Sequence, residues 1–140
     1  MRLAIEKGES FIEYAEVHGN IYGTSFEAMK DVEREGKNCL LDIDVQGVQT
    51  IKKNHPNLSA NYIFVAPPSM EVLQKRLQDR GTETKESLER RTANAAAEMA
   101  YGMASGNFDA ILVNNDLDVA CEDLTNILNK LYNDFRNDTL

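Results

Sequence analysis

The sequence predicts an α/β protein in which a mostly parallel sheet is flanked by helices. Three short apolar runs of strand length, at 39–44, 61–66 and 110–114, are each followed by a segment with apolar residues at helical spacing. This alternation of strand and helix is typical of parallel sheets joined by right-handed crossovers. The length of 140 residues suits a single domain with its own core, and the chain shows no internal repeat or low-complexity tract.

The first third of the chain predicts a small β element followed by a helix. Residues 1–7 have the pattern of a helix end, and residues 11–17 alternate as in a strand of a small antiparallel element. Residues 18–24 hold two glycines and an asparagine, so they are expected to form a turn or loop. A helix is expected over 25–35, with Gly36 at its end.

The middle of the chain predicts two strand–helix units. The run at 39–44 is expected to be a buried strand because it is short and largely apolar, and the helix after it should end near Asn54. The strand at 61–66 stops at a pair of prolines, after which Ser69 is a suitable N-cap. The helix that Ser69 begins should turn three apolar side chains inward: Met70, Leu73 and Leu77.

The last third predicts a long helix, a strand and a final amphipathic helix. Gly81 should stop the preceding helix, and Thr84 can cap a longer one from about 85 to 104. Its inward stripe is expected to be Leu88, Thr92, Ala95 and Met99. Residues 110–114 should form a buried strand, and Asp118 is expected to cap the last helix. The apolar positions of that helix are Val119, Leu124, Ile127, Leu128, Leu131 and Phe135.

The charge distribution indicates a small anionic partner. A net charge of −8 and a pI near 4.7 argue against a nucleic-acid-binding surface. Residues 75–91 nevertheless carry six basic and four acidic side chains, so this segment has a net charge of +2. A cationic segment on an acidic protein suits a small anion.

The remaining composition is that expected of a cytoplasmic protein. No apolar run reaches the length of a membrane span, and the first twenty residues are too charged for a signal peptide. Cys39 and Cys121 lack the spacing of metal ligands. Both are expected to be buried thiols in a reducing compartment, with no disulfide between them.

Two carboxylates follow the first predicted parallel strand. Asp42 and Asp44 lie at the carboxyl end of the run 39–44, which is where open α/β sheets bind ligands. The alternative is that Asp44 only caps the following helix and that Asp42 pairs with a nearby basic side chain.

Arginines lie on both sides of the short turn at 81–84. Arg76 and Arg80 are four residues apart and share a helix face, while Arg90 and Arg91 lie on the next helix. A guanidinium donates to two oxygens at once and stays charged, so these arginines could close onto phosphate groups. The alternative is that they pair with neighbouring acidic residues on a solvated surface.

A carboxylate, a phenol and a hydroxyl lie close together in the segment 11–24. The Glu13 carboxylate can accept from the ring N–H and the exocyclic amine of guanine, and the Thr24 hydroxyl can donate to its carbonyl. The Tyr22 hydroxyl can reach a phosphate. The alternatives are a cross-strand salt bridge for Glu13, turn packing for Tyr22 and a helix cap for Thr24.

Together these segments resemble the guanylate kinase family. Five runs match that family in order and spacing over nearly the whole chain: FIEYAEVHGNIYGT, LLDIDVQGV, IFVAPPS, RLQDRGTETKESLERR and ILVNNDL. The resemblance implies a partial P-loop kinase-like fold over residues 1–140, with part of the GMP-binding β element at 9–24 and a helical lid at 81–90. It implies transfer of the terminal phosphoryl group of ATP to GMP, with Mg²⁺, giving ADP and GDP.

The resemblance also implies roles for individual residues. Glu13 and Thr24 match the residues that read guanine, and Tyr22 matches a ligand of the GMP phosphate. Asp42 and Asp44 match the acidic pair of the nucleotide and metal region.

On the other side of the site, Arg80 and Arg91 match arginines that close on the transferred phosphate. Arg76 matches an arginine on the ATP side, and Asn114 matches the asparagine beside the adenine.

One family motif does not occur in the sequence. No GxxxxGK[ST] loop is present, because the pair Gly36-Lys37 has Asp31 in place of the first glycine and Asn38 in place of the hydroxyl residue. We therefore expect a fragment, about the last two-thirds of a guanylate kinase, that is inactive alone. An exposed sheet edge should then promote a homodimer or domain exchange.

Two other functions compete with this interpretation. Scaffold proteins contain non-catalytic guanylate-kinase-like modules that bind phosphorylated peptides, and other nucleoside monophosphate kinases act on AMP or UMP. Retention of Glu13, Thr24, Arg80 and Arg91 favours the enzyme, and the first two favour guanine.

Overall fold

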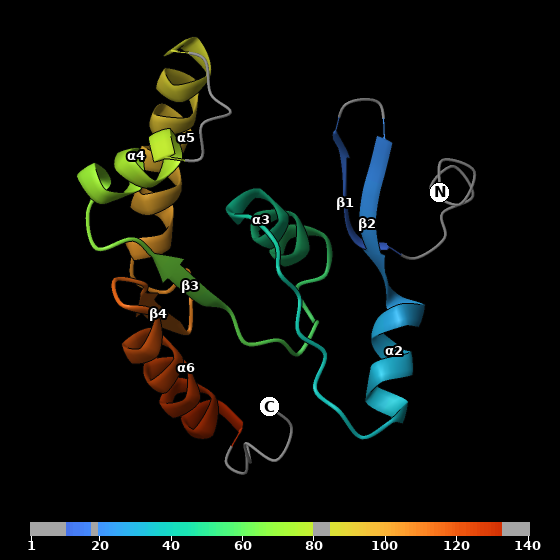
Figure 1. The fold of residues 1–140 in the computed structure, drawn as a ribbon. Coiled ribbons are helices and arrows are strands. Elements are labelled where there is room, and N and C mark those ends of the chain that lie inside the picture. Colours follow the sequence, from blue (N-terminus) through green and yellow to red (C-terminus); the bar gives the residue numbers. More distant parts are fainter. Residues whose placement is uncertain (1–10, 18–19, 80–84, 133–140) are drawn as a thin grey trace. The chain divides into compact units, whose positions relative to one another are not determined.

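The computed structural model describes residues 11–17, 20–79 and 85–132. They belong to two compact units, Met1–Ser59 and Ala60–Leu140 (Figure 1). The predicted α/β class is confirmed, since the described part of the chain contains both helices and small sheets. The helix end expected at 1–7 lies outside the described residues.

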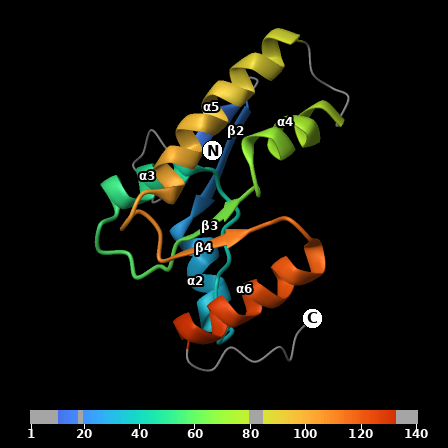
Figure 2. The same ribbon diagram turned by 90° about the vertical axis from the view of Figure 1, so that its left-hand side faces the viewer.

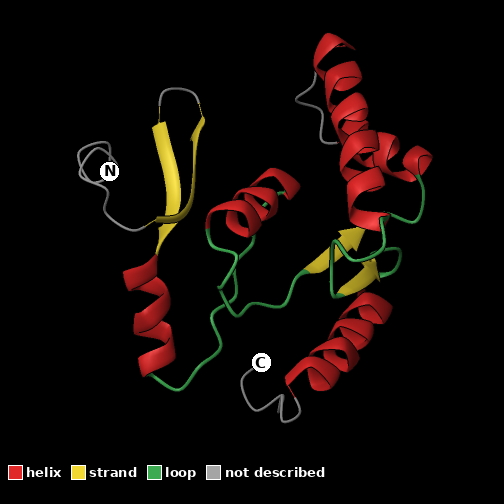
Figure 3. Ribbon diagram, turned by 180° about the vertical axis from the view of Figure 1, so that it is seen from behind, coloured by secondary structure: helices red, strands yellow, loops and turns green. Residues whose placement is uncertain are grey.

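The first unit begins with an antiparallel ribbon, drawn as yellow arrows in Figure 3. Strands β1 (Phe11–Val17) and β2 (Asn20–Ser25) pair along their length, which confirms the predicted strand at 11–17. The prediction of a loop over 18–24 is wrong, because most of that segment is β2. A Cβ added to Gly23 would lie 2.7 Å from the Cβ of Tyr14, so this glycine permits close approach of the strands.

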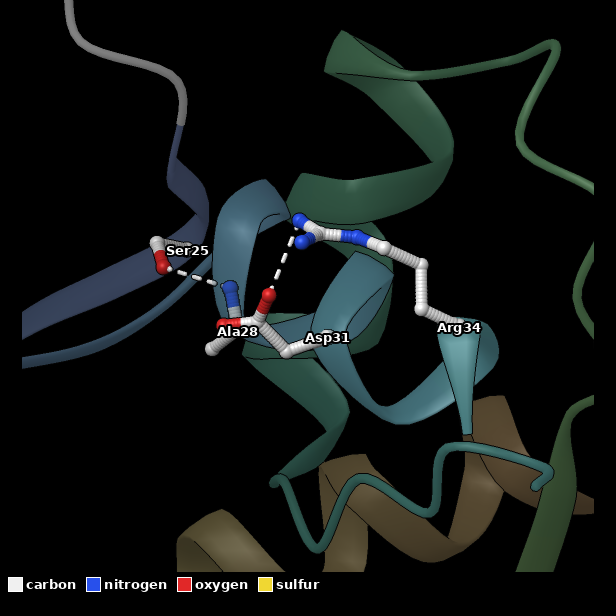
Figure 4. Close-up of polar contacts among 4 residues, drawn as sticks. All are labelled: Ser25, Ala28, Asp31 and Arg34. Carbon is white, nitrogen blue, oxygen red and sulfur yellow. Dashed lines mark hydrogen bonds and ion pairs between the residues drawn. The ribbon is translucent and has the colours of Figure 1, made fainter. Parts of the chain in front are cut away.

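Helix α2 (Phe26–Arg34) follows β2 directly and has conventional caps at both ends. The Ser25 hydroxyl accepts a hydrogen bond from the Ala28 N–H at 3.1 Å, and Asp31 pairs with Arg34 at 2.8 Å (Figure 4). At the other end Gly36 has a φ of +72° and closes a Schellman motif. The predicted helix and its glycine stop are confirmed.

The strand predicted at 39–44 is wrong. Residues 37–44 belong to no helix or strand, and Leu40 is 88% exposed. An extended segment becomes a stable strand only when a neighbour satisfies its backbone groups, and none of the described strands pairs with this segment. The parallel sheet is therefore smaller than predicted.

Helix α3 (Val45–Asn54) ends where the sequence predicts and packs on β1. Its buried side chains are Val48 and Ile51, and Ile12 of β1 is also buried. These residues form the core of the first unit.

The second unit is built on a parallel pair of strands. Strands β3 (Ile63–Ala66) and β4 (Ala110–Val113) pair in parallel, with Ile63 opposite Ala110, at the two positions the sequence predicts. Helices α4 (Met70–Asp79) and α5 (Lys85–Met103) connect them and pack on each other (Figures 1 and 2). Helix α6 (Leu117–Tyr132) follows β4 and packs against it.

The core of the second unit is tightly packed where α5 meets β3. A Cβ added to Gly102 would collide with the Phe64 ring, so α5 approaches β3 closely only because this residue is glycine. The Phe64 ring also lies 5.2 Å from that of Phe108. Leu112 and Ala120 are the buried residues of β4 and α6.

Three predictions about helix details meet different outcomes. The Ser69 hydroxyl accepts from the Val72 N–H at 3.2 Å, which confirms the cap of α4. Asp118 does not cap α6, because the carboxylate of Asp116 accepts from the N–H groups of Asp118 and Val119 at 3.0 and 3.1 Å. Val119, one of the apolar positions of this helix, is 55% exposed, and Ala120 is buried instead.

The inward stripes of α4, α5 and α6 are only half-buried. This holds for Met70, Leu73 and Leu77, for Thr92, Ala95 and Met99, and for Leu124, Ile127, Leu128 and Leu131. Gly81, Thr84 and Phe135 lie outside the described residues, as does the side chain of Leu88.

The cysteines also differ from expectation. Both are free thiols, as predicted, but Cys39 is half-buried and Cys121 is exposed. No helix in the described ranges combines the length and the apolar character that a membrane span requires.

Candidate functional site

The antiparallel ribbon of the first unit brings Glu13 and Thr24 together. They are partners in the ladder, and the Thr24 hydroxyl donates to Oε1 of Glu13 at 3.1 Å. Both residues are half-buried. Tyr22, two residues before Thr24, lies on the same face of the ribbon and is 60% exposed. This face therefore presents a carboxylate, a hydroxyl and a phenol side by side.

The opposite face of the ribbon anchors it to the unit. Ile12 is only 1% exposed and points away from the face that carries Glu13. Ser25, and not Thr24, caps α2, so the alternative role of Thr24 as a helix cap is wrong. The Thr24 hydroxyl bonds across the strands instead.

The acidic pair lies on the unpaired segment before α3. Asp42 and Asp44 are both exposed. Oδ1 of Asp44 accepts from the Gly47 N–H at 2.7 Å, so Asp44 is the N-cap of α3. The predicted cap at Asp44 is therefore confirmed.

In the second unit, the structure brings Arg76 to the turn that contains Asn114. From α4, Arg76 donates through Nη1 to the carbonyl oxygen of Asn114 at 2.8 Å and through Nη2 to that of Asn115 at 3.2 Å. The turn lies at the carboxyl end of β4, since the Asn114 N–H donates to the carbonyl of Ala66 at 2.8 Å. Arg76 and Asn114, both predicted on the ATP side, are thus neighbours.

The remaining predicted arginines are only partly described. Arg91 lies on α5 and is exposed, as is Arg90. Arg80 and the lid residues 81–84 lie outside the described residues, while 85–90 form the first turns of α5.

Two residues of the β4–α6 turn were missed from the sequence. Asn115 contributes a carbonyl to Arg76, and Asp116 caps α6. The run Asn-Asn-Asp before a helical pattern is itself a cap signal, but either Asp116 or Asp118 satisfies that signal equally well.

Two ionisable groups have pKa values shifted by their surroundings. Burial, with the nearby Asp109 carboxylate, raises the pKa of Tyr62 above its usual 10.0. The Glu71 backbone N–H and the Ser69 hydroxyl lower the pKa of the Glu71 carboxyl, which lies in the first turn of α4. Neither residue belongs to the predicted site.

The comparisons with known proteins assign the chain to a family. A family model described as guanylate kinase matches residues 1–131, so the chain belongs to the guanylate kinase family.

Individual relatives agree. The chain is 51% identical over 118 residues to guanylate kinase 1 of Oryza sativa subsp. japonica, a match that covers 84% of this chain and 30% of the relative. It is 50% identical over 110 residues to the guanylate kinase of Sus scrofa, a match that covers 79% of this chain and 54% of the relative. It is 45% identical over 120 residues to the guanylate kinase of Homo sapiens, a match that covers 86% of this chain and 60% of the relative.

A solved structure is also similar. The crystal structure of guanylate kinase from Anaplasma phagocytophilum matches with a TM-score of 0.68 and 30% identity, covering 96% of this chain and 62% of that chain. The P-loop kinase-like fold is therefore confirmed. The chain spans 30 to 60% of the length of the relatives named above. These relatives are guanylate kinases by name, and nothing in them favours the non-catalytic alternative.

Proposed function

We propose that this chain carries the GMP-reading and arginine-bearing part of a guanylate kinase, which transfers the terminal phosphoryl group of ATP to GMP and yields ADP and GDP. The observation that carries the proposal is the contact between Glu13 and Thr24 on the ribbon of a guanylate kinase family member. Two polar groups that complement guanine are held there within one hydrogen bond of each other.

Guanine recognition follows from the chemistry of this pair. The Glu13 carboxylate accepts only, and the Watson–Crick edge of guanine offers two donors, the ring N–H and the exocyclic amine. Adenine offers an acceptor at the equivalent ring nitrogen and would leave the carboxylate poorly matched. The Thr24 hydroxyl, which donates to Glu13 at 3.1 Å, would rotate to donate to the guanine carbonyl.

Tyr22 extends the GMP side of the site toward the phosphate. Its side chain is 60% exposed and shares the ribbon face with Thr24, so the hydroxyl is accessible to a ligand. A phenol donates to a phosphate oxygen without adding charge.

The acidic pair fits a metal that is shared with the nucleotide. In the described part of the chain, no three His, Cys, Asp or Glu residues gather into a cluster that could hold a metal ion. Mg²⁺ is commonly held by one or two carboxylates together with substrate phosphates and water. The exposed Asp42 and Asp44 fit that arrangement, although Oδ1 of Asp44 also caps α3. When bound, Mg²⁺ would neutralise phosphate charge.

Arg80 and Arg91 are proposed to act on the transferred group. Phosphoryl transfer depends mainly on positioning and on neutralising charge on the moving phosphoryl. A guanidinium suits this role, since it donates to two oxygens and stays charged at any working pH. The exposure of Arg91 on α5 supports its access to a nucleotide.

We propose that the second unit binds the adenine of the donor nucleotide. Asn114 presents an amide, which pairs with the donor and acceptor edge of adenine, and Arg76 lies beside it. ATP would supply the phosphoryl group.

The cytoplasm is the proposed compartment. The two free thiols, Cys39 and Cys121, are consistent with reducing conditions. The net charge of −8 supports nucleotides over nucleic acid as partners.

Calorimetric titration of the 140-residue chain tests the proposal. GMP is expected to bind and AMP to bind at least tenfold more weakly. Glu13→Gln should lower the affinity for GMP by at least tenfold, about 1.4 kcal/mol, because its amide N–H₂ faces the guanine donors. Glu27→Gln, which neutralises an exposed carboxylate on α2, is the matched control and should bind GMP normally.

Two results would contradict the proposal: equal affinity for GMP and AMP, or unchanged GMP binding by Glu13→Gln. A coupled ADP-release assay with ATP, GMP and Mg²⁺ should show no turnover by these 140 residues, because they contain no GxxxxGK[ST] loop to cradle the ATP phosphates. Turnover at the rate of an ordinary kinase would show that this loop is dispensable.

A further inference from the structure

The turn between β4 and α6 is held at both of its ends. At its start, the Asn114 N–H donates to the Ala66 carbonyl at 2.8 Å, which extends the β3–β4 ladder by one hydrogen bond. At its end, Asp116 accepts from the N–H groups of Asp118 and Val119. Both contacts are local to the strand or helix that they extend, and neither determines the path of the chain between them.

Arg76 fixes the middle of this turn from another helix. Its Nη1 and Nη2 donate to the carbonyl oxygens of Asn114 and Asn115, at 2.8 and 3.2 Å. Both distances are those of ordinary N–H···O hydrogen bonds. A planar guanidinium presents two parallel donors at a fixed spacing, whereas a lysine ammonium presents a single point charge. The two successive carbonyls therefore match an arginine in particular.

This contact has an electrostatic reason. Two consecutive carbonyl oxygens that approach the same point bring the negative ends of two peptide dipoles together. A cation between them offsets that repulsion, so the turn depends on the charge of Arg76 as well as on its hydrogen bonds. Asn114 is half-buried and the Arg76 side chain is exposed, so the turn lies at the surface of the second unit.

The turn also lies where ligands bind in this class of fold. It follows the carboxyl end of β4 and is bonded to the last residue of β3, and open α/β sheets bind ligands at the carboxyl ends of their strands. An asparagine amide at this edge has one donor group and one acceptor, which suits the edge of adenine.

From these contacts we infer that Arg76 is a positioning residue for the base of the donor nucleotide: its guanidinium holds the Asn114–Asn115 backbone, and so the Asn114 amide, where the adenine is read. Arg76 then acts through the turn and not on the ATP phosphates. The inference rests on the proposed function, because that function supplies ATP as the donor.

Adenosine distinguishes a role of Arg76 in positioning the base from a role in binding phosphate, because adenosine has the base and no phosphate. In nuclear magnetic resonance titrations of the 140-residue chain, adenosine and ATP should shift the amide signals of the turn and of the start of α6. Arg76→Ala should lower the affinities for adenosine and for ATP by the same factor, at least tenfold, and leave the affinity for GMP unchanged. Lys75→Ala, which removes an exposed charge from the same helix, should leave adenosine, ATP and GMP affinities unchanged.

Two further variants keep the test valid if Arg76→Ala folds poorly. Arg76→Lys keeps the charge but lacks the two parallel donors of the guanidinium. Its affinity for adenosine should therefore lie between those of wild type and Arg76→Ala. Asn114→Ala should lower the affinity for adenosine as much as Arg76→Ala does. The double variant should lose no more adenosine affinity than either single variant, since both substitutions act on one contact.

The outcomes that overturn the inference are distinct from failure of the proposed function. If Arg76→Ala weakens ATP but not adenosine, Arg76 contacts phosphate and the inference is wrong. If wild type binds GMP but not adenosine, the inference is also wrong, while the guanine half of the proposed function stands. If wild type binds neither GMP nor adenosine, both fail.

Discussion

At the scale of single residues, the hydrogen bond from Thr24 to Glu13 joins the two side chains that we propose to read guanine. The bond orients the hydroxyl and holds the carboxylate in place, although neither group is fully buried. A half-buried carboxylate remains hydrated on its open side, and a base that binds there must replace that water with two donors. Guanine has both donors on one edge, so in the proposed function its specific recognition depends on these two side chains.

The contribution of the hydroxyl can be measured with Thr24→Val, which keeps the shape and removes the donor. GMP affinity should fall by a factor of about 2 to 13, the value of one neutral hydrogen bond of about 0.5–1.5 kcal/mol. Calorimetry with GMP measures this change. Thr125→Val, which removes a hydroxyl bonded within α6, is the control. Full GMP affinity in Thr24→Val would exclude the hydroxyl from guanine recognition.

Tyr62 allows a prediction about pH at the same scale. Its backbone N–H donates to Asp109 at 2.7 Å, and burial with that carboxylate raises the pKa of the phenol above 10.0. The folded state therefore holds the Tyr62 proton more tightly than the unfolded state. The resulting stability is fully present below pH 10 and is lost as the pH rises through the folded pKa.

Urea unfolding between pH 8 and pH 11.5 tests this. Wild type should lose more stability across that range than Tyr62→Phe, which has no phenol to ionise at this position. Asp109→Asn should reduce the difference, since it removes the second cause of the shift. Identical pH profiles for wild type and Tyr62→Phe would contradict the prediction.

At the scale of elements, the ends of helices are explained by short-range hydrogen bonds. Ser25, Asp44, Ser69 and Asp116 each accept from backbone N–H groups in the first turn of a helix. Such caps join residues two or three positions apart, so the caps at Ser69 and Asp44 could be named from the sequence alone. The other two could not, because Thr24 competes with Ser25 before α2 and Asp118 competes with Asp116 before α6.

The competition between these aspartates is directly testable. Asp116→Ala should lower the free energy of unfolding by about 1 kcal/mol, since it leaves two N–H groups of α6 without their cap. Asp118→Ala is the matched control and should cost less than half as much. Urea denaturation of both variants gives the comparison. A larger loss for Asp118→Ala would restore the cap expected from sequence.

At the scale of the whole molecule, the parallel pair leaves apolar surface exposed. Ile111 and Val113 of β4 are 39% and 47% exposed, and Val65 of β3 is 54% exposed. These side chains lie on both faces of the pair, because residues opposite in a parallel ladder point to the same side. Parallel sheets are normally covered on both faces, so this surface favours association.

We therefore expect the 140-residue chain to form a homodimer in which this surface is covered. Sedimentation velocity at micromolar concentration should show mainly dimer. Val113→Asp should shift the population to monomer, and Ala97→Asp, which adds the same charge at an exposed position of α5, should leave it unchanged. A stable monomer for wild type would contradict the expectation.

The sequence by itself determined the helices, the family and the strands β1, β3 and β4. Strand β1 has an alternating pattern, and β3 and β4 are apolar runs. Helix hydrogen bonds and caps join residues a few positions apart, so their signals are local, as Ser69 and Gly36 illustrate. The residues that match the family could likewise be named from order and spacing.

Only the tertiary structure decided which extended segments are strands and what Arg76 contacts. Residues 20–25 look like a loop but become β2 because β1 lies beside them, and residues 39–44 look like a strand but lack a partner. Arg76 bonds carbonyls 38 and 39 positions away. A strand, and a side chain that spans two elements, are defined by partners distant in sequence, and local pattern contains no information about which partner is present.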